Sequence, residues 1–296
     1  METDFFGEKI RREGEFLIYH DESEPQANKG WLLIGLLFVN LKKYSNVLDV
    51  LSYHRKQENY FGEIHFCELP KSFNGEFGTK ARVAKAWINA YQNGLFQDAH
   101  FSCLAVNRSS PRFEHKRFSE NYHIYNRFTA MAIKAGISWM LAPYGFDQIV
   151  LTLVSDGKDR KSSPDQGLID NFESYIPSRV EMDSLVKRLF ENQSYPFITM
   201  NPVRIVRSDQ DDLLQLTDIL LGATQSALVK SSIRPTKIYL ASRITAWYQD
   251  LQKPQKQQFY RMHRKFDLWG FPDDQGRPFN RFSLSCSPSD QQPTLF

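Results

Sequence analysis

The sequence predicts an α/β layered fold, and three observations favour that class. Short apolar runs rich in β-branched and aromatic residues are typical of buried strands. Segments with apolar residues at helical spacing alternate with these runs, as they do where helices cover a sheet. With 296 residues, 41% of them hydrophobic, the chain can bury one large core, alone or with an appendage.

The expected elements follow in chain order. Strands are predicted at 16–21, 30–39, 62–69, 99–106, 147–156 and 197–208. Helices are predicted at 41–57, 79–95, 120–145 and 211–230. Pro143 and Gly145 close the third of these helices, and the fourth is apolar on nearly every side. The polar stretch GKDRKSSPDQG after residue 156 is expected to be a surface loop.

Charge and cysteine content narrow the function classes. With 37 basic and 34 acidic residues the net charge is only +3, so no global field requires a polyanionic partner. Three cysteines without a CxxC pair argue against a zinc knuckle or disulfide framework and fit reduced thiols. The N-terminal residues lack the apolar core of a signal peptide, and the run 31–39 is too short to cross a bilayer. We therefore expect a cytoplasmic protein without a membrane partner.

Two of the predicted strands end in an aspartate. FLIYHD ends at Asp21 and IVLTLVSD ends at Asp156. In open α/β sheets, functional sites lie just beyond the carboxyl ends of strands. The alternative is that each aspartate caps the turn that follows it, which aspartate often does.

A third aspartate lies within the most apolar helix. Asp218 in LLQLTDILLGA has apolar neighbours nearly all round, so we expect it to be buried. A buried ionised aspartate requires a cation, several donors or a raised pKa. Gly222, one turn later, weakens the helix, and a close approach of another backbone would explain it. The alternative is a structural Asp218 bonded to backbone amides.

Glu63 in FGEIHF completes the set of acids. It begins a predicted strand, so His65 is expected on the same face. Taken alone, Glu63 suits a solvated position and His65 an ordinary hydrogen-bonded one. Together, the four acids form a cluster of hard oxygen ligands that Mg²⁺ or Mn²⁺ prefers. Two such ions would offset the repulsion among the carboxylates, activate a water and stabilise the leaving oxygen of a phosphodiester.

The order of these motifs resembles one family. Its features here are Asp-Glu-Ser at 21–23, Glu-x-His at 63–65, Ser-Asp at 155–156 and Leu-Gln-Leu-Thr-Asp-x-x-x-Gly at 214–222. The family is domain of unknown function 3800, whose members resemble the ribonuclease H and Holliday-junction resolvase group. The resemblance covers roughly residues 14–230. It implies an RNase H-like mixed β-sheet flanked by helices in a catalytic core, 1–230. A basic, aromatic-rich helical or irregular extension, 231–296, would then pack on that core.

The resemblance also implies roles for particular residues. The catalytic and metal-binding set would be Asp21, Glu63, Asp156 and Asp218. Supporting residues around that set would be Glu22, Ser23, His65 and Gln215. The sequence departs from the family pattern where Glu24 and Pro25 replace the common glycine, which leaves the role of Glu22 open. Because neighbouring strand residues face opposite ways, only one of Asp21 and Glu22 is expected to bind metal.

Basic residues suggest where nucleic acid would lie. Residues 253–281 hold seven Lys or Arg against three Asp, and QQFYRMHRKFDLWGF interleaves basic and aromatic side chains. This pattern suits phosphate contacts with base stacking. The alternative is an ordinary helix that buries Phe259, Met262 and Phe266. The residues predicted to contact nucleic acid are Lys158, Arg160, Lys161, Arg261, Arg264 and Lys265.

These observations give two hypotheses of different classes. The first is a Mg²⁺- or Mn²⁺-dependent nuclease or phosphodiesterase, in which Asp21 bridges two ions and Asp156 and Asp218 hold one each. The second is a catalytically inactive RNase H-like subunit that binds nucleic acid within a defence or mobile-element system. The sequence has neither a nucleotide-binding glycine loop nor a GxSxG elbow. DNA and RNA both remain open as substrates, as do a partner protein and a homodimer.

Overall fold

The sheet at the centre of the molecule has seven strands. The computed structural model describes residues 12–23, 30–157, 170–229 and 233–284. The strands are β1 (Glu13–Ser23), β2 (Trp31–Asn40), β3 (Ala99–Asn107), β4 (Gln148–Asp156), β5 (Phe197–Met200), β6 (Arg204–Val206) and β7 (Phe266–Phe271). Their order is β5-β4-β1-β2-β3-β7, with β6 also beside β4. β2 runs antiparallel to β1 and β3, whereas the remaining neighbours pair in parallel.

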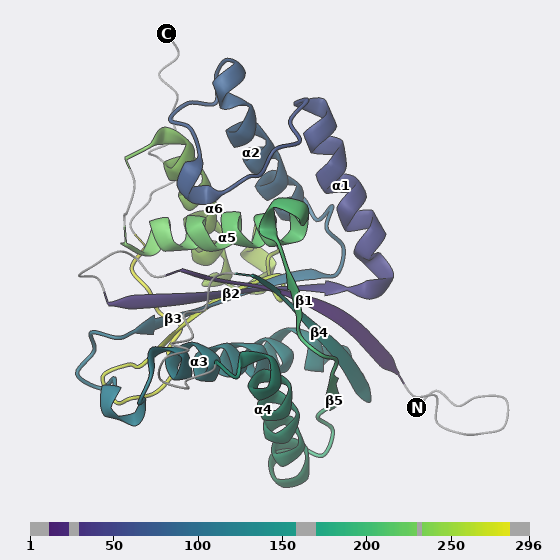
Figure 1. Cartoon of the computed structure of the whole chain (residues 1–296), viewed down its shortest axis with the longest axis vertical. Helices are drawn as coiled ribbons and strands as arrows, with labels where there is room; N and C mark the ends of the chain where they lie inside the picture. The colour runs from purple at the N-terminus through teal and green to yellow at the C-terminus, as the bar shows by residue number, and fades with distance from the viewer. Residues whose placement is uncertain (1–11, 24–29, 158–169, 230–232, 285–296) are drawn as a thin grey trace, which may run out of the picture.

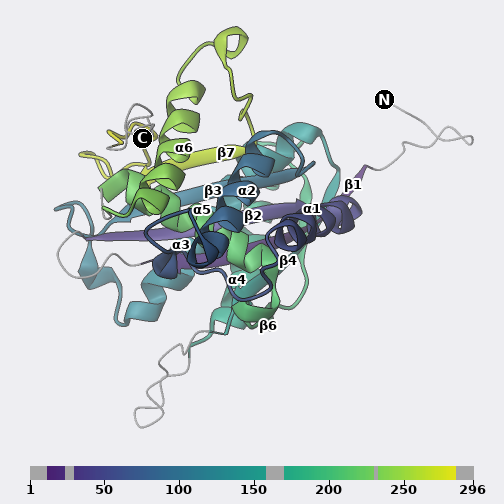
Figure 2. The ribbon, with the colours of Figure 1, turned by 90° about the horizontal axis from the view of Figure 1, so that it is seen from above.

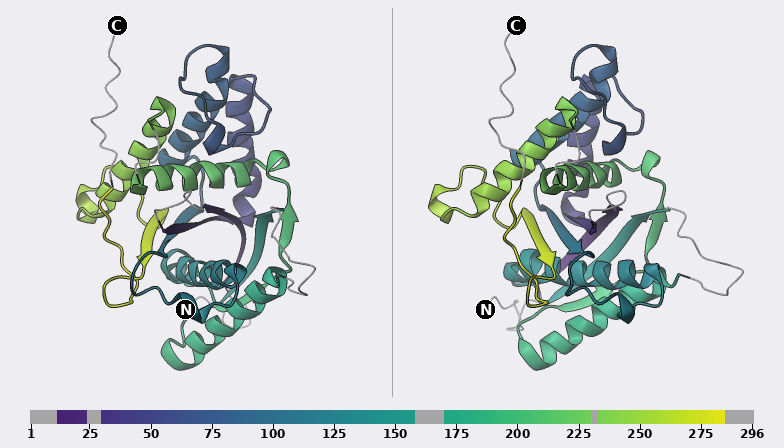
Figure 3. Two further views of the ribbon diagram at one scale, coloured as in Figure 1. Left: turned by 60° about the vertical axis from the view of Figure 1, so that its left-hand side comes forward. Right: turned by 90° about the vertical axis from the view of Figure 1, so that its left-hand side faces the viewer.

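Helices cover both faces of this sheet (Figure 1, Figure 3). The upper layer in Figure 1 holds α1 (Tyr44–Gln57), α2 (Thr79–Gln92), α5 (Asp212–Val229) and α6 (Pro235–Leu251). The lower layer holds α3 (Asn121–Gly136) and α4 (Phe172–Val186). Each layer packs its own apolar cluster against the sheet. Because both faces are covered, the central strands are apolar nearly throughout.

The alternation of β1 sets which side chains face which layer. Leu17 and Tyr19 belong to the cluster under α5, while Phe16 and Ile18 belong to the cluster over α3. Asp21 lies opposite Gly35 of β2. A Cβ at Gly35 would lie only 3.2 Å from Leu221, so this glycine lets α5 lie close to the sheet. The close approach places α5 directly above the carboxyl end of β1.

Most predicted elements are present, and the predicted class, a mixed sheet flanked by helices, is confirmed. The strands expected near 16–21, 30–39, 99–106 and 147–156 are β1, β2, β3 and β4. The helices expected at 41–57, 79–95 and 211–230 are α1, α2 and α5. The helix expected at 120–145 is α3, continued by a π-helical turn at Ile137–Leu141 and a 3₁₀ turn at Ala142–Tyr144.

Two predictions about elements were wrong, and one helix was missed. Residues 62–69 form no strand; they run irregularly into a 3₁₀ turn at Phe66–Glu68. The strand expected at 197–208 is divided into β5 and β6 around Pro202, which cannot donate a backbone hydrogen bond. Helix α4 was not predicted, because it contains Pro177 and its apolar residues lie on several sides rather than on one stripe.

The C-terminal region is more regular than expected. Helix α6 packs on α5, and β7 extends the same central sheet beside β3 (Figure 2). The helical alternative for residues 257–271 is wrong, because this segment is a turn followed by a strand. Met262 and Phe266 are buried as that alternative expected, but Phe259 is 79% exposed. The proposed boundary at residue 230 stays a prediction.

No helix in the described parts of the chain combines the length and apolar character needed to cross a membrane.

Candidate functional site

Three aspartates from separate elements meet at one edge of the sheet. Asp21 lies near the end of β1, Asp156 is the last residue of β4, and the two strands are parallel neighbours. Asp218 comes from α5, which covers this edge. All three line a single small pocket, together with His65, Gln215 and Ser208. The structure therefore brings together the aspartates predicted from strand ends and from the apolar helix.

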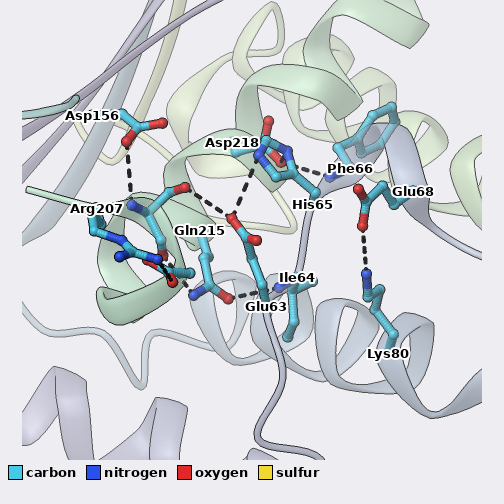
Figure 4. Close-up of polar contacts among 12 residues, drawn as sticks. Glu63, Ile64, His65, Phe66, Glu68, Lys80, Asp156, Arg207, Gln215 and Asp218 are labelled. Atoms are coloured by element: carbon cyan, nitrogen blue, oxygen red, sulfur yellow. Dashed lines mark hydrogen bonds and ion pairs between the residues drawn. The ribbon is translucent and has the colours of Figure 1, made fainter. Parts of the chain in front are cut away.

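Asp218 receives donors from the segment that was expected to be a strand (Figure 4). Its Oδ2 accepts a hydrogen bond from the Phe66 amide at 2.6 Å and lies 3.2 Å from His65 Nδ1. The side chain is 21% exposed rather than fully buried, because it opens into the pocket. Asp218 thus accepts a bond from a backbone amide, as expected if its role were structural, and it also lines the acidic pocket.

His65 is held between two carboxylates. Its Nδ1 faces Asp218, and its Nε2 lies 3.8 Å from Glu63 Oε1. The contact with Asp218 raises the pKa of His65 to about 9, against the effect of burial, with Glu63 and Asp21 adding to the rise. The imidazole therefore carries a proton and a positive charge at neutral pH.

Ser208, a residue not predicted to belong to the site, joins Glu63 and Asp156. Ser208 Oγ donates to Glu63 Oε1 at 2.9 Å, and its amide donates to Asp156 Oδ1 at 3.3 Å. Ser208 begins the 3₁₀ turn Ser208–Gln210 that leads into α5. The sequence carries no local signal for this role, because Asp211 is the residue that caps α5 by accepting from the amides of Leu213 and Leu214.

Gln215 ties three segments together, which is the supporting role expected for it. Its Oε1 accepts from the Ile64 amide at 2.8 Å and from Arg55 Nη2 at 2.7 Å. Its Nε2 donates to the Ser208 carbonyl at 2.8 Å. One buried side chain therefore fixes the paths of the segments that carry Glu63 and Ser208.

Arg55 of α1 holds the segment that leads to Glu63, and this role was not predicted from the sequence either. Only 6% exposed, it reaches both oxygens of Asp212 through Nε, at 2.9 and 3.0 Å. Its Nη1 donates to the Gly62 carbonyl at 2.8 Å, and its guanidinium lies 5.0 Å from the centre of the Trp87 ring. The sequence signal was an arginine on the same stripe as buried Val47 and Leu51.

Gly222 has a clear packing reason, although a different one from that expected. A Cβ there would lie 2.3 Å from Cγ of Phe66. It is thus a side chain, not a backbone, that approaches this glycine. Because the Phe66 ring packs against Gly222, the Phe66 amide lies beside Asp218 and residues 62–66 pack against α5.

Glu22 and Ser23 lie on opposite faces of β1. Glu22 Oε2 is 3.8 Å from Nε2 of His20, whose ring also contacts Thr129 of α3 at 3.3 Å. Glu22 therefore shares the α3 face with His20, away from Asp21, as strand alternation predicted. Ser23 Oγ donates to Gln225 Oε1 of α5 at 2.9 Å, on the face that Asp21 shares.

The donor set suits a divalent cation in type, but its present arrangement does not form a cage. Carboxylate oxygens are the ligands that Mg²⁺ and Mn²⁺ prefer. Within the described ranges, no three His, Cys, Asp or Glu side chains are placed to share one ion. Asp218, Glu63 and Asp156 instead bond to Phe66, Ser208 and His65. Asp21, Asp156 and Asp218 are the residues that would hold an ion, with Glu63 beside them.

The basic residues predicted to contact nucleic acid are not gathered at this pocket. Lys158, Arg160 and Lys161 lie outside the described residues. Arg261, Arg264 and Lys265 precede β7, which lies three strands across the sheet from β1. The Arg264 carbonyl is 2.6 Å from Nδ1 of His100, so this backbone is anchored to β3. A role for these side chains in binding stays a prediction.

Comparisons with known proteins add one distant likeness. No family model matches the chain, and no curated protein matches it. A solved structure that is similar to it is the ribonuclease H2 from Pyrococcus horikoshii OT3. The two share 10% sequence identity with a TM-score of 0.41, over 84% of this chain and 97% of that one.

Proposed function

We propose that this chain is a metal-dependent nuclease that hydrolyses phosphodiester bonds in nucleic acid. The observation that carries the proposal is the meeting of Asp21, Asp156 and Asp218, from two strands and a helix, around one pocket with Glu63 at its side. Acids drawn from separate elements repel one another, so a cluster of this kind favours a site for divalent cations. The resemblance to the domain of unknown function 3800 family is part of the same proposal.

The chain's own residues have definite tasks in this scheme. Asp21, Asp156 and Asp218 would bind the cation, which when bound supplies charge neutralisation, a more acidic water and support for a leaving oxygen. Ser208 orients the carboxylates of Glu63 and Asp156. Protonated His65 offsets the charge of Asp218 and Glu63 before an ion enters. Gln215 and Arg55 hold the segment that carries Glu63 and His65.

A second candidate function rests on a specific observation. Although the aspartates line one pocket, no three acids of the described residues are placed to share an ion, and they bond to Ser208, His65 and the Phe66 amide. This arrangement also suits an inactive subunit that binds nucleic acid. Such a subunit would bind without cleaving, within a defence or mobile-element system.

Cleavage assays separate the two candidates. Purified protein is incubated with single- and double-stranded DNA and RNA in Mn²⁺ or in EDTA, and the melting temperature is measured in parallel. The nuclease predicts cleavage only with metal, and an ion at a hundredfold excess over its Kd adds about 2.7 kcal/mol to the free energy of unfolding. Tight binding without cleavage of any substrate supports the inactive subunit instead.

Asp218→Asn tests the site itself, with Asp209→Asn as its matched control. Asp209 lies in the turn before α5, where it pairs with Arg207 at the surface. We expect Asp218→Asn to remove the stabilisation by Mn²⁺ and to lower cleavage at least about 100-fold, while Asp209→Asn changes neither. If Asp218→Asn keeps the full increment from Mn²⁺, Asp218 is not a ligand.

A further inference from the structure

A second concave surface lies on the α3 face, at the carboxyl end of β3. Its volume is about 470 Å³, within the range typical of ligand sites. The segment 111–118 after β3 forms one wall, α3 forms the second, and residues 271–276 after β7 form the third. In Figure 1 the segment after β3 lies at the lower left, next to α3. We name this surface the arginine groove.

The charges of this groove favour an anion. Arg112, Arg117 and Arg127 all line it and are exposed. Among the described lining residues, the one carboxylate is that of Glu114, which pairs with Arg117. Arg112 Nε donates to a neutral backbone carbonyl, that of Asp274. The groove therefore carries three positive charges and one negative charge, although the whole chain is almost neutral.

The floor of the groove is aromatic. Phe113 and Phe118 lie nearly parallel, with ring centres 5.8 Å apart. The guanidinium of Arg127 lies 5.8 Å from the centre of the Phe118 ring. Phe118 and Phe271 are half-buried, so part of each ring faces the groove. Arginine next to open aromatic faces is the combination that binds phosphate and stacks unpaired bases.

The groove also lies at the same edge of the sheet as the acidic pocket. β1, β3, β4 and β7 all run in one direction, so their carboxyl ends share that edge. Three strand spacings, roughly 14 Å, separate β1 from β7. Asp21 faces the α5 layer, whereas the groove opens on the α3 layer. A flexible chain can pass around this edge more readily than a stiff duplex can.

We propose that the arginine groove binds single-stranded nucleic acid, with Arg112, Arg117 and Arg127 on phosphates and Phe118 and Phe271 beside the bases. The inference rests on the proposed function, because it assigns the strand that the acidic pocket would cut. It adds a binding site distinct from the basic segment before β7, and it favours unpaired over paired substrates.

Binding measured in EDTA tests this site without any cleavage. Fluorescein-labelled (dT)20, (U)20 and a 20-base-pair duplex are titrated with wild type and the double variant Arg117→Gln/Arg127→Gln, at several salt concentrations. We expect the double variant to bind single strands roughly tenfold more weakly and to lose about 1.4 from its salt slope, since two phosphate contacts are gone. The two single strands show whether deoxyribose or ribose is preferred.

Two further variants make the test specific. Arg179→Gln removes an exposed arginine of α4 that pairs with Asp183 one turn away, much as Arg117 pairs with Glu114, and should bind like wild type. Phe118→Leu keeps an apolar side chain but removes the ring, and should weaken binding about fivefold with an unchanged salt slope. Melting temperatures establish that each variant is folded.

The outcomes separate this inference from the proposed nuclease. If Arg117→Gln/Arg127→Gln leaves the affinity and the salt slope unchanged, the arginine groove does not bind nucleic acid, whatever the result of the cleavage assay. Tighter binding of the duplex than of both single strands overturns this inference as well. If single strands bind at the groove but are not cleaved with metal, the proposed binding site is supported and the proposed nuclease activity is contradicted.

Discussion

Two aspartate–histidine regions of this molecule show opposite electrostatics. At the acidic pocket, His65 lies 3.2 Å from Asp218, and its pKa is raised to about 9. At the far side of the sheet, His100 of β3 and Asp267 of β7 are both shifted toward their neutral forms by burial. The pKa of His100 is lowered, and that of Asp267 is raised to about 6.

The difference lies in whether the partners in each region carry a charge. Asp218 has an imidazole and the Phe66 amide, and its pocket opens to solvent. The residue opposite Asp267 in the sheet is Ser102, whose buried hydroxyl has no hydrogen-bond partner in the described structure. His100 bonds to the neutral Arg264 carbonyl, and the Leu268 amide offsets only part of the effect of burial on Asp267, so both groups favour their neutral forms. The carboxylates beside His65 favour its charged form instead. Charge is thus retained at the proposed site and suppressed at the packed end of the sheet.

The largest effect should come from removing the guanidinium of Arg55, which holds the segments around the acidic pocket. Arg55→Met keeps the apolar stem but leaves Asp212 without its guanidinium partner and removes one of the two donors to Gln215 Oε1. We therefore expect the free energy of unfolding to fall by about 3 kcal/mol. Urea unfolding measures this. Arg179→Met is the control, because Arg179 pairs with Asp183 at the surface of α4 and its loss should cost at most about 1 kcal/mol. Equal losses in both variants would contradict a special role for Arg55.

At the other end of the sheet, removing a charge should stabilise the protein. The folded protein binds the Asp267 proton more tightly than the unfolded chain does, so stability falls as pH rises from about 4 to about 6. Asp267→Asn should therefore raise the free energy of unfolding by about 2–3 kcal/mol at pH 7. The gain should vanish below about pH 4, where the carboxyl is neutral in both states. A variant less stable than wild type at pH 7 would contradict a pKa of Asp267 raised by burial.

Gly222→Ala tests how closely residues 62–66 pack against α5. Alanine normally stabilises a helix by about 1 kcal/mol relative to glycine. Here the new Cβ would meet Phe66 at 2.3 Å, so we expect a net loss of about 2 kcal/mol. In a Phe66→Ala background the clash is gone, and the same change should become stabilising. Thermal unfolding of the four proteins in this cycle checks the sign of both changes.

The smallest effect should be a pH dependence that differs between the two histidines. Because the folded pKa of His65 is raised, its stabilisation is fully present below about pH 6.5 and is lost as pH rises through about 9. With 30% of His65 exposed, the change should be on the order of 1 kcal/mol. His65→Gln, measured in EDTA, should flatten the stability curve between pH 7 and about 9.5.

His100→Gln should alter the opposite side of that curve. The pKa of His100 is lowered by burial, so the unfolded chain takes up the proton first as pH falls below about 6.5. Wild type therefore loses stability toward acid pH through this residue, and the variant should lose less. A variant whose acid limb matches wild type would show that His100 is not held neutral.

Local patterns were enough to predict much of the fold. The alternation and apolar runs of β1 to β4, and the helical spacing of α1, α2 and α5, are properties of neighbouring residues. For the same reason the sequence identified Asp21 and Asp156 at strand ends and Asp218 on an apolar helix. Helix α4 and strand β7 were missed, because Pro177 and the mixed basic and aromatic residues before Phe266 hide the local pattern.

Neighbouring residues alone specify the layered class, the central strands and the three aspartates that line the pocket. The path of residues 62–66 depends on long-range packing, because the amides of Ile64 and Phe66 bond to side chains of α5 rather than to another strand. The bond from Ile64 to Gln215 joins residues 151 positions apart, a separation at which no periodicity carries information. Arg55, Ser208 and the packing of Phe66 against Gly222 belong to the same long-range network. The identity of the acids was therefore a local property of the chain, whereas their partners depend on how distant segments pack.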